Sequence, residues 1–192
     1  MKYLLLFSIL FFSFQEISWG SDIQNNFLVA KPKMLDSRFQ KTVIYMLYHN
    51  AEGAAGLVVN KPIQTISISK LFSDSSLIPP ENMKNKEVTL YWGGPVKPEQ
   101  IYFIHSSEYK SKDFISSNKD FTITRSSEVL FDIARNMGPE NYLVLSGIAV
   151  WSPGQLDHEM TQDSWDNKIN NYFPLFDNVN DIWNLLINSQ DI

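Results

Sequence analysis

Residues 142–160 read Y-L-V-L-S-G-I-A-V-W-S-P-G-Q-L-D-H-E-M, a stretch that indicates a buried strand followed directly by a helix. Residues 142–150 are apolar and rich in branched side chains, with a single glycine, which is typical of a strand buried on both faces. Ser152 can cap a helix, Pro153 suits its first position, and Gln155 follows Ser152 at the spacing of a capping box. We therefore expect a central strand that leads into a helix beginning at Ser152.

The rest of the chain predicts several strands and further helices. Strand-forming residues and turn signals predict strands at 27–30, 42–49, 56–60, 87–92, 101–105 and 121–124. Helical signals appear at 67–72, from Ser126 or Ser127 to Met137, and over 179–187, while 165–173 fits either a helical turn or a loop. Because strands and helices do not alternate regularly, we expect an α+β fold with a mixed, mostly antiparallel sheet rather than a doubly wound one.

Composition narrows the function classes. The length of 192 residues favours one domain with its own core. The net charge is -5, and no segment gathers lysine and arginine, so the chain lacks the electrostatic footprint of phosphate binding and we do not expect a nucleic-acid partner. There is no cysteine, which excludes disulfides, thiol catalysis and thiolate metal sites.

The first 20 residues differ in kind from the rest. Lys2 precedes an apolar block at 3–14, and small residues flank a possible cleavage site after Gly20. We interpret residues 1–20 as a secretory signal peptide, residues 21–192 as the single mature domain, and the protein as exported to the periplasm. A buried first helix and a retained anchor are the alternatives. The block falls short of the roughly 20 residues needed to span a bilayer, so we expect no stable membrane span in the mature chain.

Familiar catalytic motifs are missing. The sequence contains no G-x-S-x-G, P-loop or H-E-x-x-H pattern. The pair Gly93-Gly94 predicts a tight turn or bulge, because a dinucleotide site needs a third glycine and a strand-to-helix context. We expect no cofactor.

The densest group of possible metal ligands is Asp157, His158, Glu159 and Asp163. On a helix, neighbouring side chains diverge by about 100° per residue, so three successive ligands converge poorly on one ion. We therefore expect a solvated helix face and no metal site.

Two histidines are the best general-base candidates. His49 and His105 each end an expected strand, where a side chain can reach a cleft, but spacing pairs neither with a nucleophile or carboxylate. Asp36 and Arg38 stand two apart and fit a local turn contact, and Asn60 fits a residue that caps the backbone in a turn.

Five segments in order resemble the YqgE/AlgH family of bacteria over about residues 27–183. They are F-L-V-A-K-P-K-M-L-D-S-R-F, T-V-I-Y-M-L-Y-H-N-A-E-G-A-A-G-L-V-V-N-K-P, Y-W-G-G-P-V, the strand ending at His105, and Y-L-V-L-S-G-I-A-V-W-S-P-G-Q-L. The resemblance implies bacterial origin and a single α+β domain with a bifurcated, barrel-like sheet and flanking helices. It also implies an alternative, cytoplasmic localisation, because members of the family generally look cytoplasmic.

The resemblance supplies a candidate common surface but no reaction, because the family is largely uncharacterised. The positions that match its shared residues are Asp36, Arg38, His49, Gly53, Gly56, Asn60, Gly93, Gly94, Pro95, His105, Trp151, Gly154, Gln155, Leu156 and Glu159.

Three functional hypotheses follow. The leading one is a binding or regulatory module without enzymatic activity, whose partner is an unknown protein or small molecule. The first alternative is a hydrolase or transferase with a cleft formed by Asp36, Arg38, His49, His105 and Glu159. The second is a transcriptional regulator, as the name of one branch of the family suggests, which both the charge and an exported location oppose.

Overall fold

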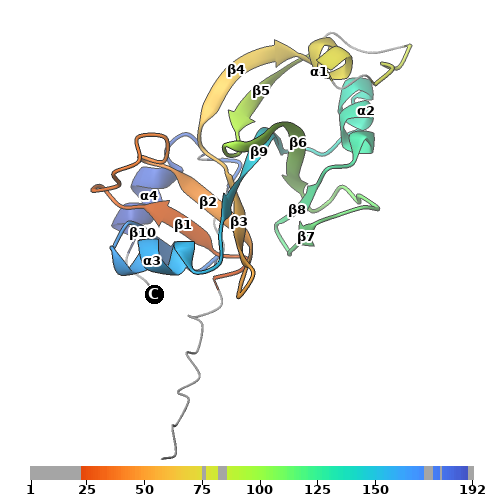
Figure 1. Cartoon of the computed structure of the whole chain (residues 1–192). Coiled ribbons are helices and arrows are strands. Elements are labelled where there is room, and N and C mark those ends of the chain that lie inside the picture. The colour runs from red at the N-terminus through yellow and green to blue at the C-terminus, as the bar shows by residue number, and fades with distance from the viewer. Residues whose placement is uncertain (1–22, 75–76, 82–85, 171–174, 178, 190–192) are drawn as a thin grey trace, which may run out of the picture.

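The computed structural model describes residues 23–74, 77–81, 86–170, 175–177 and 179–189. In this part of the chain, ten strands form one sheet and four helices lie around it (Figure 1). The expected signal peptide, residues 1–20, lies outside the described residues.

The elements follow one another in an irregular order, as expected for an α+β protein. The strands are β1 (Phe27–Ala30), β2 (Val43–Asn50), β3 (Gly53–Val58), β4 (Pro62–Ser67), β5 (Glu87–Trp92), β6 (Val96–Ser106), β7 (Ser116–Ser117), β8 (Phe121–Thr124), β9 (Tyr142–Trp151) and β10 (Trp165–Lys168). The helices are α1 (Ile68–Asp74), α2 (Ser127–Arg135), α3 (Gln155–Thr161) and α4 (Ile182–Asn188).

The sheet forks at β9, its central strand. One edge of β9 pairs with β6, and the other edge pairs with β5 over Val144–Ser146 and with β3 over Ala149–Trp151. The path therefore runs β10-β1-β2-β3-β9-β6-β8-β7, with β5 and β4 branching from β9. Among the described strands, only the pairing of β5 with β9 is parallel. The mixed, mostly antiparallel and bifurcated sheet is confirmed, and it stays open rather than closing into a barrel.

Leu143, Val144 and Leu145 of β9 are all buried, and because successive side chains of a strand point to opposite faces, they pack into different clusters. Leu145 belongs to a core cluster that α4 covers, and Val144 to a cluster that includes α1 and α2. Ala149 and Trp151 belong to a third cluster with Leu156 of α3. The expected burial on both faces is confirmed at Leu143–Leu145 and wrong at Val150, which is 44% exposed, and this one strand joins the three clusters.

The helix after β9 begins later than the sequence predicts. The N–H of Gln155 donates to the carbonyl of Ser152 at 3.0 Å, which closes a turn, and Gly154 takes the cap position with a φ of 72°. The expected start at Ser152 is therefore wrong. The other half of the capping-box prediction is confirmed, because Gln155 Oε1 accepts a hydrogen bond from the N–H of Ser152 at 3.1 Å.

Two further local predictions were wrong. No strand was expected between residues 60 and 87, but Pro62 begins β4 there, as an exposed edge strand permits. Helix α2 ends at Arg135, because Asn136 adopts a left-handed cap with a φ of 59°, and Met137 is 60% exposed rather than part of the apolar face. The ambiguous segment from residue 165 starts with a strand, β10. Among the described helices, none has the length and apolar character needed to cross a bilayer.

Candidate functional site

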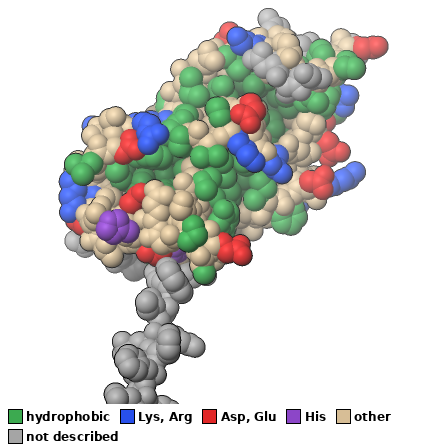
Figure 2. Space-filling view, in the orientation of Figure 1, with side chains coloured by type: hydrophobic (Ala, Val, Ile, Leu, Met, Phe, Trp, Pro, Cys, Tyr) green, Lys and Arg blue, Asp and Glu red, His purple; other side chains and the backbone are tan. Residues whose placement is uncertain are grey.

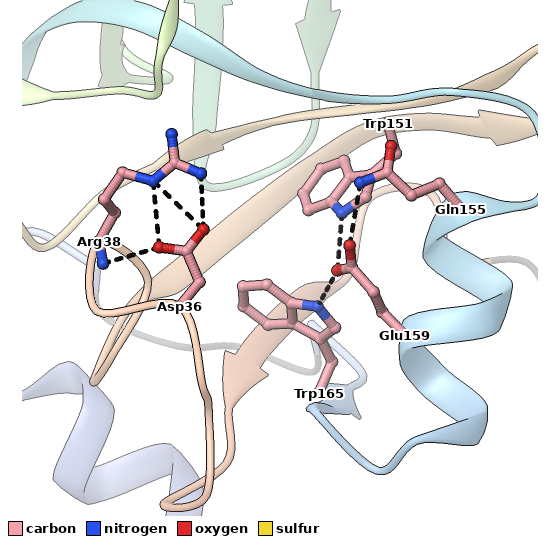
Figure 3. Close-up of polar contacts among 6 residues, drawn as sticks. All are labelled: Asp36, Arg38, Trp151, Gln155, Glu159 and Trp165. Carbon is pink, nitrogen blue, oxygen red and sulfur yellow. Dashed lines mark hydrogen bonds and ion pairs between the residues drawn. The ribbon is translucent and has the colours of Figure 1, made fainter.

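A pocket of about 270 Å³ lies between the loop before β2, the end of β9, α3 and the start of β10. The loop of residues 31–42 forms one side and α3 the other (Figure 3). The lining residues are Met34, Leu35, Asp36, Arg38, Phe39, Pro95, Ala149, Val150, Trp151, Gln155, Glu159, Gln162, Ser164 and Trp165.

The carboxylate of Glu159 holds one wall of this pocket together. Its Oε2 accepts hydrogen bonds from the indole Nε1–H of Trp151 at 3.0 Å and of Trp165 at 2.8 Å. Its Oε1 accepts one from Gln155 Nε2 at 3.0 Å (Figure 3). A single carboxylate on α3 thus ties the end of β9 to the start of β10. Since a carboxylate offers about four acceptor sites, one site remains for a further donor.

The opposite wall carries a forked ion pair. Arg38 donates from Nε to Asp36 Oδ1 at 3.0 Å and from Nη2 to Oδ2 at 2.6 Å, and its backbone N–H donates to Oδ1 at 3.0 Å. These hydrogen bonds hold the pKa of Asp36 below its ordinary value. The expected turn contact between the two residues is therefore present, and it fixes the guanidinium at the pocket edge.

Aromatic rings line the space between these walls. Phe39 lies 5.8 Å from Trp165, ring centre to ring centre, and Trp151 lies 6.1 Å from Trp165, both edge to face. The Arg38 guanidinium lies 5.7 Å from the centre of the Phe39 ring. One ring of the pocket therefore already accepts a cation on its face. The face of the molecule in Figure 2 shows hydrophobic side chains with acidic and basic ones among them.

The residues of the nominated common surface fall into three groups in the structure, apart from Leu156, which is buried in a core cluster. Six residues of this surface line the pocket, namely Asp36, Arg38, Pro95, Trp151, Gln155 and Glu159. The glycines and Asn60 position the backbone instead, and the two histidines lie elsewhere.

Gly93 and Gly94 let two segments touch. A Cβ on Gly93 would lie 2.3 Å from the carbonyl oxygen of Gly147, and one on Gly94 would lie 2.0 Å from the carbonyl carbon of Ile148. Only glycine permits this approach, and it brings the neighbouring Pro95 to the pocket. The glycine pair lies in the short connection between β5 and β6, and the irregularity in the β6–β9 register comes later, between Val96 and Ile101, so the bulge is not at the glycines themselves.

Asn60 clamps the ends of two strands. Its Oδ1 accepts from the N–H of Val43 at 2.8 Å, and its Nδ2 donates to the carbonyl of Lys41 at 2.9 Å. The expected role in backbone capping is confirmed, which leaves Asn60 outside the pocket chemistry.

Neither histidine reaches the pocket. The side chain of His49 is only 9% exposed, and its Nε2 lies 3.2 Å from Asp157 Oδ1 on α3. His105 is fully buried, with Nδ1 3.0 Å from the carbonyl of Ser106, and within the described residues its Nε2 has no hydrogen-bond partner. The two histidines therefore cannot act there as general bases with Asp36 or Glu159.

The four possible metal ligands on and after α3 do not converge, because each contacts a different partner. Asp157 faces His49, His158 faces Gln162, and Glu159 faces the two indoles. Asp163 pairs with Lys31 and Lys33, whose hydrogen bonds lower its pKa to about 2. The described residues contain no group of three or more possible ligands around one point. The prediction of a solvated face was wrong for Glu159, which is half-buried.

Comparison with known proteins shows the family to which this chain belongs. A family model described as AlgH-like matches residues 27–192. The chain belongs to the AlgH-like family. A UPF0301 protein of Thiobacillus denitrificans is 36% identical over 144 residues, which cover 75% of this chain and 76% of the relative. One of Rickettsia akari is 32% identical over 170 residues, which cover 84% and 85%.

Solved structures of similar proteins have the same fold. The solution structure of AlgH from Pseudomonas aeruginosa has a TM-score of 0.66 and 31% identity, and the match covers 82% of each chain. A crystal structure from Corynebacterium diphtheriae has a TM-score of 0.64 at 18% identity, covering 87% of this chain and 86% of the other, so it shows the fold alone. The AlgH-like family is bacterial and uncharacterised in function.

Part of the pocket wall in this AlgH-like domain was not predicted from the sequence. Trp165 and Phe39 line the pocket, but neither was nominated. Trp165 reaches the site because β10 pairs with β1, with Ala30 opposite Trp165, a contact between residues far apart in the chain. A tryptophan six residues after Glu159 was the one local signal.

Proposed function

We propose that the protein is a non-enzymatic binding module and that its ligand site is the pocket between the 31–42 loop and α3. The observation that carries this proposal is the Glu159 carboxylate, which three donors of the protein already hold. A carboxylate held in this way is fixed in orientation as a recognition group rather than free to attack. The charged side chains lining the pocket, Asp36, Arg38 and Glu159, sum to one negative charge.

The ligand we infer carries a cationic group, such as an ammonium. Aromatic faces attract cations, and the rings of Trp151 and Trp165 also line the pocket, whereas the Phe39 ring already carries the Arg38 guanidinium. Glu159 supplies the compensating charge together with its remaining acceptor site. The pocket volume of about 270 Å³ suits one small group, which is either a small molecule or a side chain of a protein partner.

The test is an NMR titration that follows the indole N–H resonances of Trp151 and Trp165. Choline is the cationic probe, and 3,3-dimethylbutanol is its uncharged counterpart of the same shape. We expect choline to shift both resonances saturably and to bind at least about tenfold more tightly than the alcohol, because the alcohol lacks the charge. Glu159→Gln should weaken choline binding, whereas Glu52→Gln, in an exposed turn, should not. If both probes bind equally well, or if neither binds, the proposal of a cationic ligand is wrong.

The hydrolase or transferase alternative loses its support. It required His49 and His105 to share a cleft with Asp36, Arg38 and Glu159, and neither histidine lines the pocket. The transcriptional-regulator alternative also lacks support. Lys31 and Lys33 next to the pocket could contact nucleic-acid phosphates, but both are already paired with Asp163.

We also propose that the protein is exported. The support is the sequence of residues 1–20 alone. N-terminal sequencing of the native protein after cell fractionation tests it: a start at Ser21 outside the cytoplasm is expected, and an intact Met1 in the cytosol would contradict it.

A further inference from the structure

A second cavity, of about 390 Å³, lies between α1, α2 and β6. The two helices lie beside each other at one end of the molecule, with Phe72 and Phe131 in ring contact at 5.0 Å (Figure 1). The cavity is lined by Leu71, Leu77, Glu99, Gln100, Ile101, Phe103, Arg125, Ser127 and Leu130. None of these residues lines the first pocket, and the volume is within the roughly 300–1,000 Å³ of small-molecule sites.

The floor of this cavity is apolar. Leu71, Phe103 and Leu130 are 5%, 3% and 4% exposed and belong to one core cluster. Leu77 and Ile101 are partly buried and pack against the same cluster. An occupant of this floor therefore needs an apolar body, whose burial stabilises the complex in proportion to the area removed from water.

The rim supplies hydrogen-bond donors. Arg125 is exposed, and none of the ion pairs between described residues involves it. Burial raises the pKa of Tyr102, and the charge of Arg125 and a hydrogen bond between the two side chains act in the opposite direction. The Tyr102 hydroxyl donates to Gln100 Oε1 at 2.7 Å, which directs the amide N–H groups of Gln100 to other acceptors.

We propose that this cavity binds a single-chain alkyl carboxylate, with its chain on Leu71, Phe103 and Leu130 and its carboxylate on Arg125. A guanidinium matches a carboxylate with two parallel hydrogen bonds, and Gln100 provides a third donor beside it. Glu99 also stands at the rim and is exposed like Arg125, so water and salt screen both charges, and the direct hydrogen bonds to Arg125 and Gln100 determine the preference. An apolar cavity with a cation at its mouth therefore favours a fatty acid over a neutral lipid.

The experiment is a titration of the whole protein with decanoate, kept below its micelle concentration, followed by methyl NMR. We expect saturable shifts at Leu71 and Leu130 and none at Leu186, which lies in the core cluster under α4. Decanol should bind at least about tenfold more weakly, because it lacks the charge-assisted pair with Arg125. Removing methylenes from the acid should weaken binding roughly fourfold for each one.

Two surface variants separate specific binding from a general charge effect. Arg125→Gln should weaken decanoate binding at least about tenfold. Arg135→Gln, which removes an exposed arginine of α2 that lies outside the cavity lining, should leave it unchanged. The proposal fails if decanoate gives no saturable shifts, if decanol binds equally well, or if Arg125→Gln has no effect. The last two results together would indicate an apolar surface that accepts a side chain of a protein partner.

Discussion

Glu159 shows how one side chain can determine the shape of a site. Its two oxygens accept from two indoles and one amide that come from β9, β10 and α3. An indole has only its N–H to donate, so each tryptophan depends on this carboxylate for a partner. The residue is therefore needed for structure as well as for the proposed recognition.

Replacing Glu159 should destabilise the fold. Glu159→Ala leaves the nearly buried indole N–H groups of Trp151 and Trp165 without an acceptor, and we expect a loss of about 2 kcal/mol or more in the free energy of unfolding. Glu159→Gln keeps one acceptor oxygen and should cost about half as much. Urea unfolding monitored by tryptophan fluorescence measures both. Glu52→Ala is the control, and it should change the free energy of unfolding by less than about 0.5 kcal/mol. A loss as large as that of Glu159→Ala would contradict the structural role of Glu159.

At the scale of elements, glycines set the distance between β9 and the chain that crosses it. A Cβ on Gly94 would meet the backbone of Ile148 at 2.0 Å, and backbone atoms cannot move aside as a flexible side chain can. Gly154 also has a positive φ, of 72°, but nothing lies within 4 Å of where its Cβ would be. Gly94, whose φ is 153°, thus combines a packing requirement with a conformational one, whereas Gly154 has the conformational requirement alone.

This contrast gives a paired prediction for two alanine variants. Gly94→Ala should cost about 3 kcal/mol, because strain and overpacking add, and should also displace Pro95 at the pocket. Gly154→Ala should cost about 1–2 kcal/mol, the penalty for a left-handed residue with a side chain. Denaturant midpoints of the two proteins provide the comparison. A larger loss at Gly154 would contradict this account.

Local signals in the sequence explain which elements were predicted well. The bounds of β1, β5 and β8 were predicted correctly, because strand formers stand between clear turn residues. Pairing partners were not predictable in this way: β10 is too short and too rich in asparagine and charge to look like a strand until β1 is placed beside it. Six of the fourteen pocket residues followed from the family resemblance, whereas Trp165 depended on the pairing of β10 with β1.

For the whole molecule, β9 is the strand that the two branches of the sheet share. Leu145 lies at its middle with no exposed surface, in the cluster covered by α4, while its neighbour Val144 faces the cluster of α1 and α2. If β9 leaves, β3, β5 and β6 each lose their pairing with it, and the two branches lose the strand that joins them, so the branches should unfold together.

Coincident transitions test this coupling. Tryptophan fluorescence and far-ultraviolet circular dichroism should report one urea midpoint, and Leu145→Ala should lower the free energy of unfolding by about 2–5 kcal/mol in both signals. As a control, Ile63→Ala, on the exposed side of edge strand β4, should change it by less than about 1 kcal/mol. Two separate midpoints would show that the branches are independent.

The pairing of β1 with β10 also has a consequence for biosynthesis. The pocket needs Asp36 and Arg38 from near the start of the chain and Trp165 from near its end, more than 120 residues later. A nascent chain can build β2 and β3 early, yet it has no complete ligand site until β10 has left the ribosome. Ligand binding through this pocket is consequently a property of finished chains, and incomplete translation products that retain most of the sheet would not compete for the ligand.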